Sequence, residues 1–172
     1  MDTKIHDRLS SLMLWNGADE YLKAGRILFG NHKDKPDFVQ FPGAPAYFVV
    51  CQAIELALKA YLRGSGKDED FLVNKCKHDL IIALKAAEEC GLTNLIKFET
   101  QDQATLDLAN KLYSSKALQF AIVGYYTYLS FKYLLVLAER LVTKTEAFCL
   151  ENVECHAGKP TAIVALRSAR RK

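Results

Sequence analysis

Apolar residues recur at helical spacing along most of this chain. Between residues 12 and 28 they form one broad stripe, and Gly30 follows as a stop signal. The same period predicts helices at residues 12–28, 45–63, 78 or 79–91, 100–113 and 127–148. Only PTAIVAL, after Pro160, has the β-branched content of a strand, and it is too short and solitary to make a sheet. The pattern therefore predicts an all-α fold of about five helices.

The window PAYFVVCQAIELALKAYLRGSG is apolar almost all the way round a helix, yet it carries one polar line. Gln52, Glu55, Lys59 and Arg63 follow one another at spacings of three, four and four residues, which places them on one narrow face. The first interpretation is an ordinary solvated face on which Glu55 and Lys59 make an i, i+4 pair. In the second, the stripe opens onto a groove that Glu55 helps to line, and Lys59, Arg63, Lys77 and His78 form an anion-binding wall there. In that case Lys59→Ala should weaken anion binding and leave the fold intact.

His78 and Asp79 stand where the third predicted helix begins, and three roles are open to them. Asp79 suits a helix cap, and His78 could hold the preceding GSGKDED loop by a hydrogen bond. Alternatively, the helix start could bind phosphate with help from Lys75 and Lys77, although Asp79 would compete for the same N–H donors. Lys116, in SSKALQF, is a further basic candidate whose simpler interpretation is solvent exposure.

Composition narrows the class of protein. The chain has 172 residues, of which 50% are hydrophobic, and this length and composition suit one domain. Its net charge of +3 is too small for a dedicated nucleic-acid binder. The basic tail RSARRK is an exception within the chain. The most apolar windows are interrupted by Glu55, Lys59 and Lys132, so we expect no membrane span.

Five cysteines, an odd number, and an N-terminus without an apolar signal segment predict a reducing, cytoplasmic location. Cys51 and Cys90 fall on apolar helical faces and suit core positions. In CLENVECH, Cys149, Cys155 and His156 could supply metal ligands, but a zinc site needs about four. We therefore expect no metal and no cofactor.

Four segments in order carry a resemblance to a known family. ADEYLKAGRIL, AIELALKAYLRGSG, KHDLIIALKAAEECGL and the final long helix resemble the HEPN superfamily of small helical domains. The combination of Glu-x-x-x-Lys on an apolar helix with His-Asp-Leu opening the next helix carries most of the likeness. It covers residues 12–148, and leaves residues 1–11 as a lead-in and residues 149–172 as an extension with a basic tail. KLYSSKALQFAIVG also looks like the basic, aromatic segment that many of these proteins have before the last helix.

The resemblance implies an up-and-down helical bundle that commonly dimerises, in a superfamily of RNA-cleaving toxins, phage-defence nucleases and non-catalytic binders. Its nucleases use an arginine followed four to six residues later by a histidine, near the start of the last long helix. Here that helix contains Arg140 and no histidine, and only Arg26 and His32, across Gly30 at the end of the first helix, meet the spacing.

Because the last long helix lacks the arginine–histidine motif of the nucleases, the sequence favours a non-catalytic HEPN-like binding module. Its ligand would be RNA, a nucleotide or a partner protein such as a nucleotidyltransferase or antitoxin. The module would work as a homodimer, without membrane contact. The alternative is a metal-independent ribonuclease of the toxin or phage-defence type, with Arg26 and His32 as its catalytic pair.

We expect the chain to be a dimer, because the aromatic residues of GYYTYLSFKYLLVL exceed what one face of one helix can bury: Tyr125, Tyr126, Tyr128, Phe131 and Tyr133. The competing expectation is that the bundle's own core absorbs these rings. Light scattering at micromolar concentration should report the mass of two chains, and a single-chain mass would contradict the prediction.

Overall fold

A computed structural model describes residues 9–30, 43–119 and 130–153. Within these ranges the chain forms helices and no strand, which confirms the all-α fold class. The long helices are α1 (Ser11–Gly30), α2 (Ala44–Gly64), α3 (Leu80–Glu89), α4 (Thr100–Ser114) and α5 (Phe131–Glu151). The short helices are a π-helical turn at Phe71–Cys76 and 3-10 turns at Leu92–Asn94 and Ala117–Gln119.

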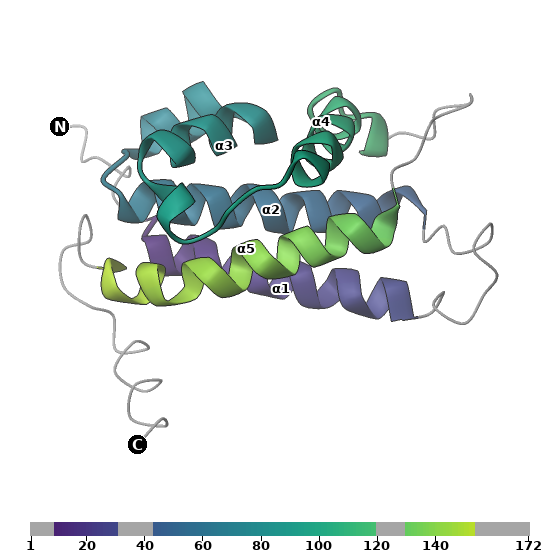
Figure 1. The fold of residues 1–172 in the computed structure, drawn as a ribbon, viewed down its shortest axis with the longest axis horizontal. Helices are drawn as coiled ribbons and strands as arrows, with labels where there is room; N and C mark the ends of the chain where they lie inside the picture. Colours follow the sequence, from purple (N-terminus) through teal and green to yellow (C-terminus); the bar gives the residue numbers. More distant parts are fainter. Residues whose placement is uncertain (1–8, 31–42, 120–129, 154–172) are drawn as a thin grey trace, which may run out of the picture.

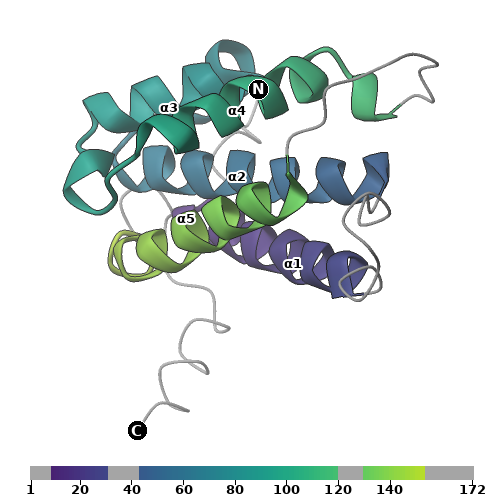
Figure 2. The same ribbon diagram turned by 45° about the vertical axis from the view of Figure 1, so that its right-hand side comes forward.

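Helix α2 lies in the middle of the molecule. In Figures 1 and 2, α1 and α5 run along one side of it, and α3 and α4 lie on the other. Val50, Ile54, Leu58 and Leu62 are completely buried along its length. Because α2 has protein on both sides, its sequence is apolar nearly all round instead of showing the single stripe of a surface helix.

The apolar character of α2 also meets the length and composition of a membrane span. It is the one helix among the described residues that does so, but 72% of its most apolar window is buried inside the structure. Burial of this kind is typical of a core helix.

Aromatic contacts join α1, α2 and the start of α5. The Phe131 ring lies 5.4 Å from the Phe29 ring and 5.1 Å from the Tyr47 ring, centroid to centroid, and it is buried. Tyr133 is instead 54% exposed. The bundle's own core therefore absorbs Phe131, which no longer supports the predicted dimer, whereas Tyr133 remains available to it. Tyr125, Tyr126 and Tyr128 lie outside the described residues.

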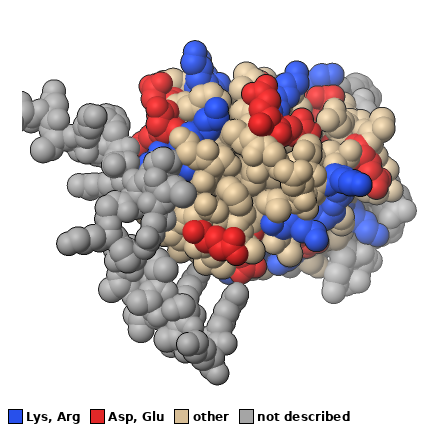
Figure 3. All heavy atoms as spheres, turned by 60° about the vertical axis from the view of Figure 1, so that its left-hand side comes forward, with Lys and Arg blue, Asp and Glu red and all other residues tan. Residues whose placement is uncertain are grey.

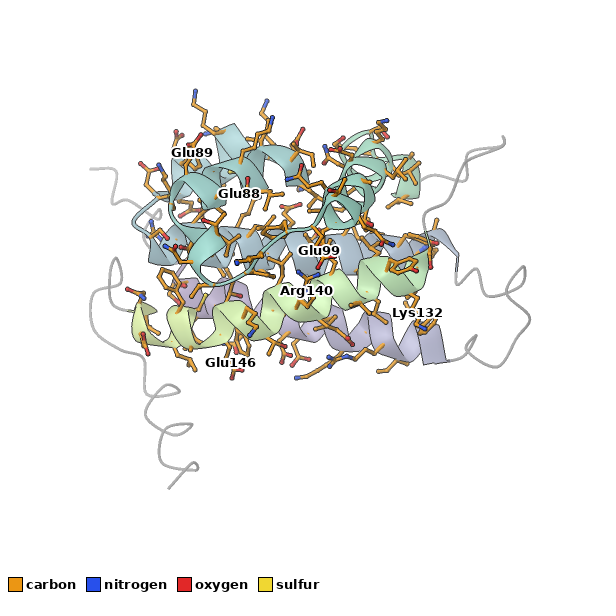
Figure 4. The ribbon with its side chains drawn as sticks, in the orientation of Figure 1. Glu88, Glu89, Glu99, Lys132, Arg140 and Glu146 are labelled. Carbon is orange, nitrogen blue, oxygen red and sulfur yellow. The ribbon has the colours of Figure 1, made fainter. Side chains whose placement is uncertain are left out.

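Helix α4 is fastened to α5 by Arg140. Its guanidinium donates to both carboxylate oxygens of Asp102, at 3.0 and 3.1 Å, and to the Lys97 carbonyl at 2.8 Å. Figure 4 shows Arg140 reaching from α5 towards the start of α4, near Glu99. Asp102, on the side of its helix that the periodicity assigns to solvent, is largely buried by this contact.

The observed helices match the predicted ones in number and order, and differ at their ends. Helix α5 continues to Glu151, past the predicted end of the bundle at residue 148. The π-helical turn at Phe71–Cys76 was not predicted, because its residues show neither helical nor strand periodicity over a useful length. PTAIVAL lies outside the described residues.

Two glycines in α1 test the packing between α1 and α2. A Cβ on Gly25 would lie 2.6 Å from Cγ2 of Val50, which is fully buried, whereas a Cβ on Gly30 would meet nothing within 4 Å. We expect Gly25→Ala to lower the free energy of unfolding by about 1–3 kcal/mol through overpacking. Gly30→Ala should leave stability unchanged or raise it by up to about 1 kcal/mol through helix propensity. Urea unfolding of both variants tests this, and equal effects would contradict the close packing at Gly25.

Candidate functional site

The carboxylate of Glu55, midway along α2, is the centre of a polar cluster inside the bundle. Glu55 is only 2% exposed, and a buried carboxylate is costly unless donors surround it. Lys59 Nζ donates to its Oε1 at 2.6 Å, while the Tyr113 hydroxyl and His78 Nδ1 donate to its Oε2 at 2.6 and 3.1 Å. We call these side chains, with Gln52, the Glu55 cluster.

Tyr113 brings α4 into the Glu55 cluster. Its hydroxyl lies within hydrogen-bond distance of Gln52 Oε1 as well as Glu55. Burial, and then the negative charge of Glu55, raise the pKa of Tyr113 far above its usual range, so the hydroxyl keeps its proton and remains a donor. The same two causes, in the same order, raise the pKa of the buried Cys51 thiol.

His78 connects the Glu55 cluster to the surface. Its side chain is 63% exposed, yet Nδ1 is held by the buried carboxylate. Since a carboxylate only accepts, the proton lies on Nδ1, and Nε2 of the neutral ring is left as the acceptor. The Tyr113 ring meets the His78 ring edge to face at 6.2 Å, so two contacts fix the orientation of an exposed imidazole.

A tight turn presents His78. Lys77 has φ 48° and ψ −123°, and the Asp79 N–H donates to the Cys76 carbonyl at 2.9 Å, which are the features of a type II′ turn. The Lys77 carbonyl accepts a 2.6 Å hydrogen bond from Lys59 Nζ. Helix α2 therefore holds this turn at two consecutive residues, through Lys59 at Lys77 and through Glu55 at His78.

The start of α3 is capped by side chains. Asp79 Oδ1 accepts from the N–H groups of Ile81 and Ile82, each at 2.9 Å, and Asn110 Oδ1 accepts from the Leu80 N–H at 2.8 Å. This confirms the capping interpretation of Asp79. Phosphate binding by these backbone donors, the third role considered for this position, is wrong because the donors are occupied.

The polar stripe of α2 divides into two parts. Glu55, Lys59 and Arg63 are all buried, so the solvated-face interpretation is wrong for these three residues. Arg63 does not join the Glu55 cluster: its Nε donates to the Leu9 carbonyl at 2.8 Å and its Nη1 to the Lys67 carbonyl at 3.1 Å. The structure brings Glu55, Lys59, His78 and the backbone carbonyl of Lys77 together and places Arg63 elsewhere.

The remaining basic candidates lie at the surface. Lys75 and Lys77 are exposed beside His78, and Lys116 is exposed three residues after Tyr113, whose carbonyl accepts the Lys116 N–H at 3.0 Å. On the face drawn in Figure 3, acidic and basic side chains are both present, separated by uncharged surface.

Arg26, the described half of the candidate nuclease pair, donates from Nε to Glu139 of α5 at 2.7 Å. His32 lies outside the described residues, as do Cys155 and His156. Cys149 is buried, and burial raises its pKa to about 11. Within the described ranges no group of three or more His, Cys, Asp or Glu side chains is arranged to hold a metal ion.

Comparisons with protein-family models, with curated proteins and with solved structures found no match. The relation to the HEPN superfamily therefore stays a prediction from the sequence.

Sequence reasoning did not identify Tyr113 or Asn110 as part of the site. The helical period shows only that Tyr113 falls on the buried face of α4 and Asn110 on a partly buried one. A tyrosine on a buried face is a usable signal, because its hydroxyl needs a polar partner there. The partner could not be named from sequence, since Glu55 lies 58 residues away.

The burial of Lys59 changes what its removal should do. Lys59→Ala would leave Glu55 without its cationic partner, so we expect the free energy of unfolding to fall by about 3–5 kcal/mol. Lys23→Ala, which breaks exposed pairs with Asp19 and Glu20, should cost less than about 1 kcal/mol. Chemical denaturation measures both.

A double variant serves as the control. Glu55→Gln combined with Lys59→Met removes both charges, and it should lose less stability than Lys59→Ala alone. A Lys59→Ala loss as small as that of Lys23→Ala would show that Glu55 does not depend on Lys59.

Proposed function

We propose that this chain is a non-catalytic, HEPN-like binding module whose recognition site is the surface around His78, and that its ligand carries phosphate, as a nucleotide or RNA. The observation that supports this most directly is the exposed His78 ring held by the buried carboxylate of Glu55. Nδ1 of His78 serves the fold by donating to Glu55, but the side chain is still largely exposed, and binding sites commonly orient an exposed imidazole through a buried acceptor.

The charges around His78 favour an anion. Lys59 neutralises Glu55 inside the cluster, so that the carboxylate does not oppose an anion at the surface. Lys75 and Lys77 are exposed next to His78 in the chain. Asp79 is the opposing charge on this turn, and its Oδ1 is engaged by the backbone of α3 and by Asn110. Exposed lysines with an oriented histidine are a common arrangement for phosphate.

A binding measurement tests the proposal. Isothermal titration calorimetry with adenosine nucleotides and a short single-stranded RNA should detect binding to the wild type. His78→Ala should weaken binding about tenfold, because the His78 ring donates one charge-assisted hydrogen bond to the phosphate when it takes up a second proton on Nε2. His78→Gln retains a donor for Glu55 and should fold as the wild type does, while still weakening binding. Lys85→Ala, which removes an exposed lysine from the middle of α3, should bind as the wild type does.

Two outcomes would contradict the proposal. If no phosphate-bearing compound binds at millimolar concentration, the proposed phosphate ligand is wrong. If binding is unchanged in His78→Ala and His78→Gln, the site lies elsewhere.

The ribonuclease alternative predicts a different result. Metal-independent cleavage of a mixed RNA pool that disappears in His32→Ala would support it. We expect no such cleavage, because Gly30 separates Arg26 from His32 at the end of α1 and Arg26 is paired with Glu139.

A further inference from the structure

Two lysines of this chain adopt a backbone conformation that favours glycine. Lys77, with φ 48°, and Lys116, with φ 61°, are the two non-glycine residues with positive φ among those described. Lys77 occupies the first central position of a type II′ turn, and Lys116 follows the end of α4, and glycine is the preferred residue at both kinds of position. A side chain with a Cβ is disfavoured there by about 1–2 kcal/mol.

Tyr113 contacts both of the turns that carry these lysines. Lys77 precedes His78, whose ring packs against Tyr113, and the Tyr113 carbonyl accepts the Lys116 N–H at 3.0 Å. Tyr113 therefore connects the two turns. Both lysines are exposed, and no contact of either ammonium group is seen within the described ranges. Their strained conformations are therefore not explained by an interaction of their own side chains.

The buried charge pair of α2 fixes one of these turns. The Lys77 carbonyl accepts from Lys59, which is itself held by Glu55, and the next residue, His78, donates to Glu55. These hydrogen bonds hold the peptide between Lys77 and His78 in the orientation that a type II′ turn requires. The buried Glu55–Lys59 ion pair thus stabilises this turn, although lysine is unfavourable at its first central position.

We propose that Lys77, His78 and Lys116 together bind a terminal phosphate monoester, as at the 5′ end of a nucleotide or RNA. This rests on the function proposed above and specifies its ligand. Two exposed lysines on turns that Tyr113 connects, together with the oriented His78 ring in its protonated form, supply three donors suited to one dianionic group. A phosphodiester backbone would instead call for cations spread over several successive phosphates.

The signature of this proposal is an opposite change in stability and in binding. Lys77→Gly and Lys116→Gly relieve the backbone strain, so each should raise the midpoint of thermal unfolding by about 2–8 °C. Each should also weaken binding of a 5′-phosphorylated oligonucleotide about tenfold. Lys77→Asn, which tolerates positive φ without a charge, should weaken binding equally, and Lys77→Arg should retain it.

A comparison of two RNA ligands distinguishes a phosphate monoester site from phosphate binding in general. The wild type should bind an RNA octamer with a 5′ phosphate at least tenfold more tightly than the same octamer with a 5′ hydroxyl, and inorganic phosphate should compete. The exposed helical lysine Lys85 supplies the control, since Lys85→Ala removes the same charge and should change neither affinity.

Equal affinity for the two octamers, with loss of binding in His78→Ala, would overturn the monoester site and leave the phosphate-binding function in place. Glycine variants that are more stable and bind the 5′ phosphate as the wild type does would show that these lysines do not contact the ligand. Failure of the wild type to bind either octamer, nucleotides or phosphate would overturn both proposals.

Discussion

The fold of this chain depends on how one buried carboxylate is satisfied. Glu55 lies on the central helix between two layers of the bundle, where an unpaired charge would cost several kcal/mol, on the order of the whole stability of a domain. Its donors come from α2 itself, from the turn before α3 and from α4. Satisfying this one group therefore sets the positions of α3 and α4 against α2, in addition to the apolar contacts of that layer.

The helical pattern could be predicted from the sequence because it depends on local spacing. The period of apolar residues placed all the long helices, and the all-round apolar character of α2 indicated that protein covers it. The period could not show what covers the polar stripe. That depends on His78 and Tyr113, which lie 23 and 58 residues from Glu55, and no local rule pairs residues at such distances.

The candidate site was predicted in part, for the same reason. Lys59 and His78 do contact Glu55, and Lys77 joins them only through its backbone carbonyl, which accepts from Lys59. Arg63, one turn further along the same face, instead reaches a carbonyl of the segment before α1. Two residues one turn apart on a helix can face different neighbours when the covering layer ends between them. The positive φ of Lys77 and Lys116 was invisible to sequence reasoning, because local preference assigns such positions to glycine. Positions where local preference and structure disagree are where functional constraints are expected.

The central claim is that the buried Glu55 carboxylate orients the exposed His78 ring, and the ring nitrogens report this directly. In a long-range proton–nitrogen NMR correlation spectrum, with the His78 signals assigned by their loss in His78→Gln, the neutral ring should carry its proton on Nδ1 and leave Nε2 unprotonated. In Glu55→Gln the preference for Nδ1 should weaken, because an amide accepts more weakly than a carboxylate. A neutral His78 ring in wild type that carries its proton on Nε2, the form usual for free histidine, would contradict the account.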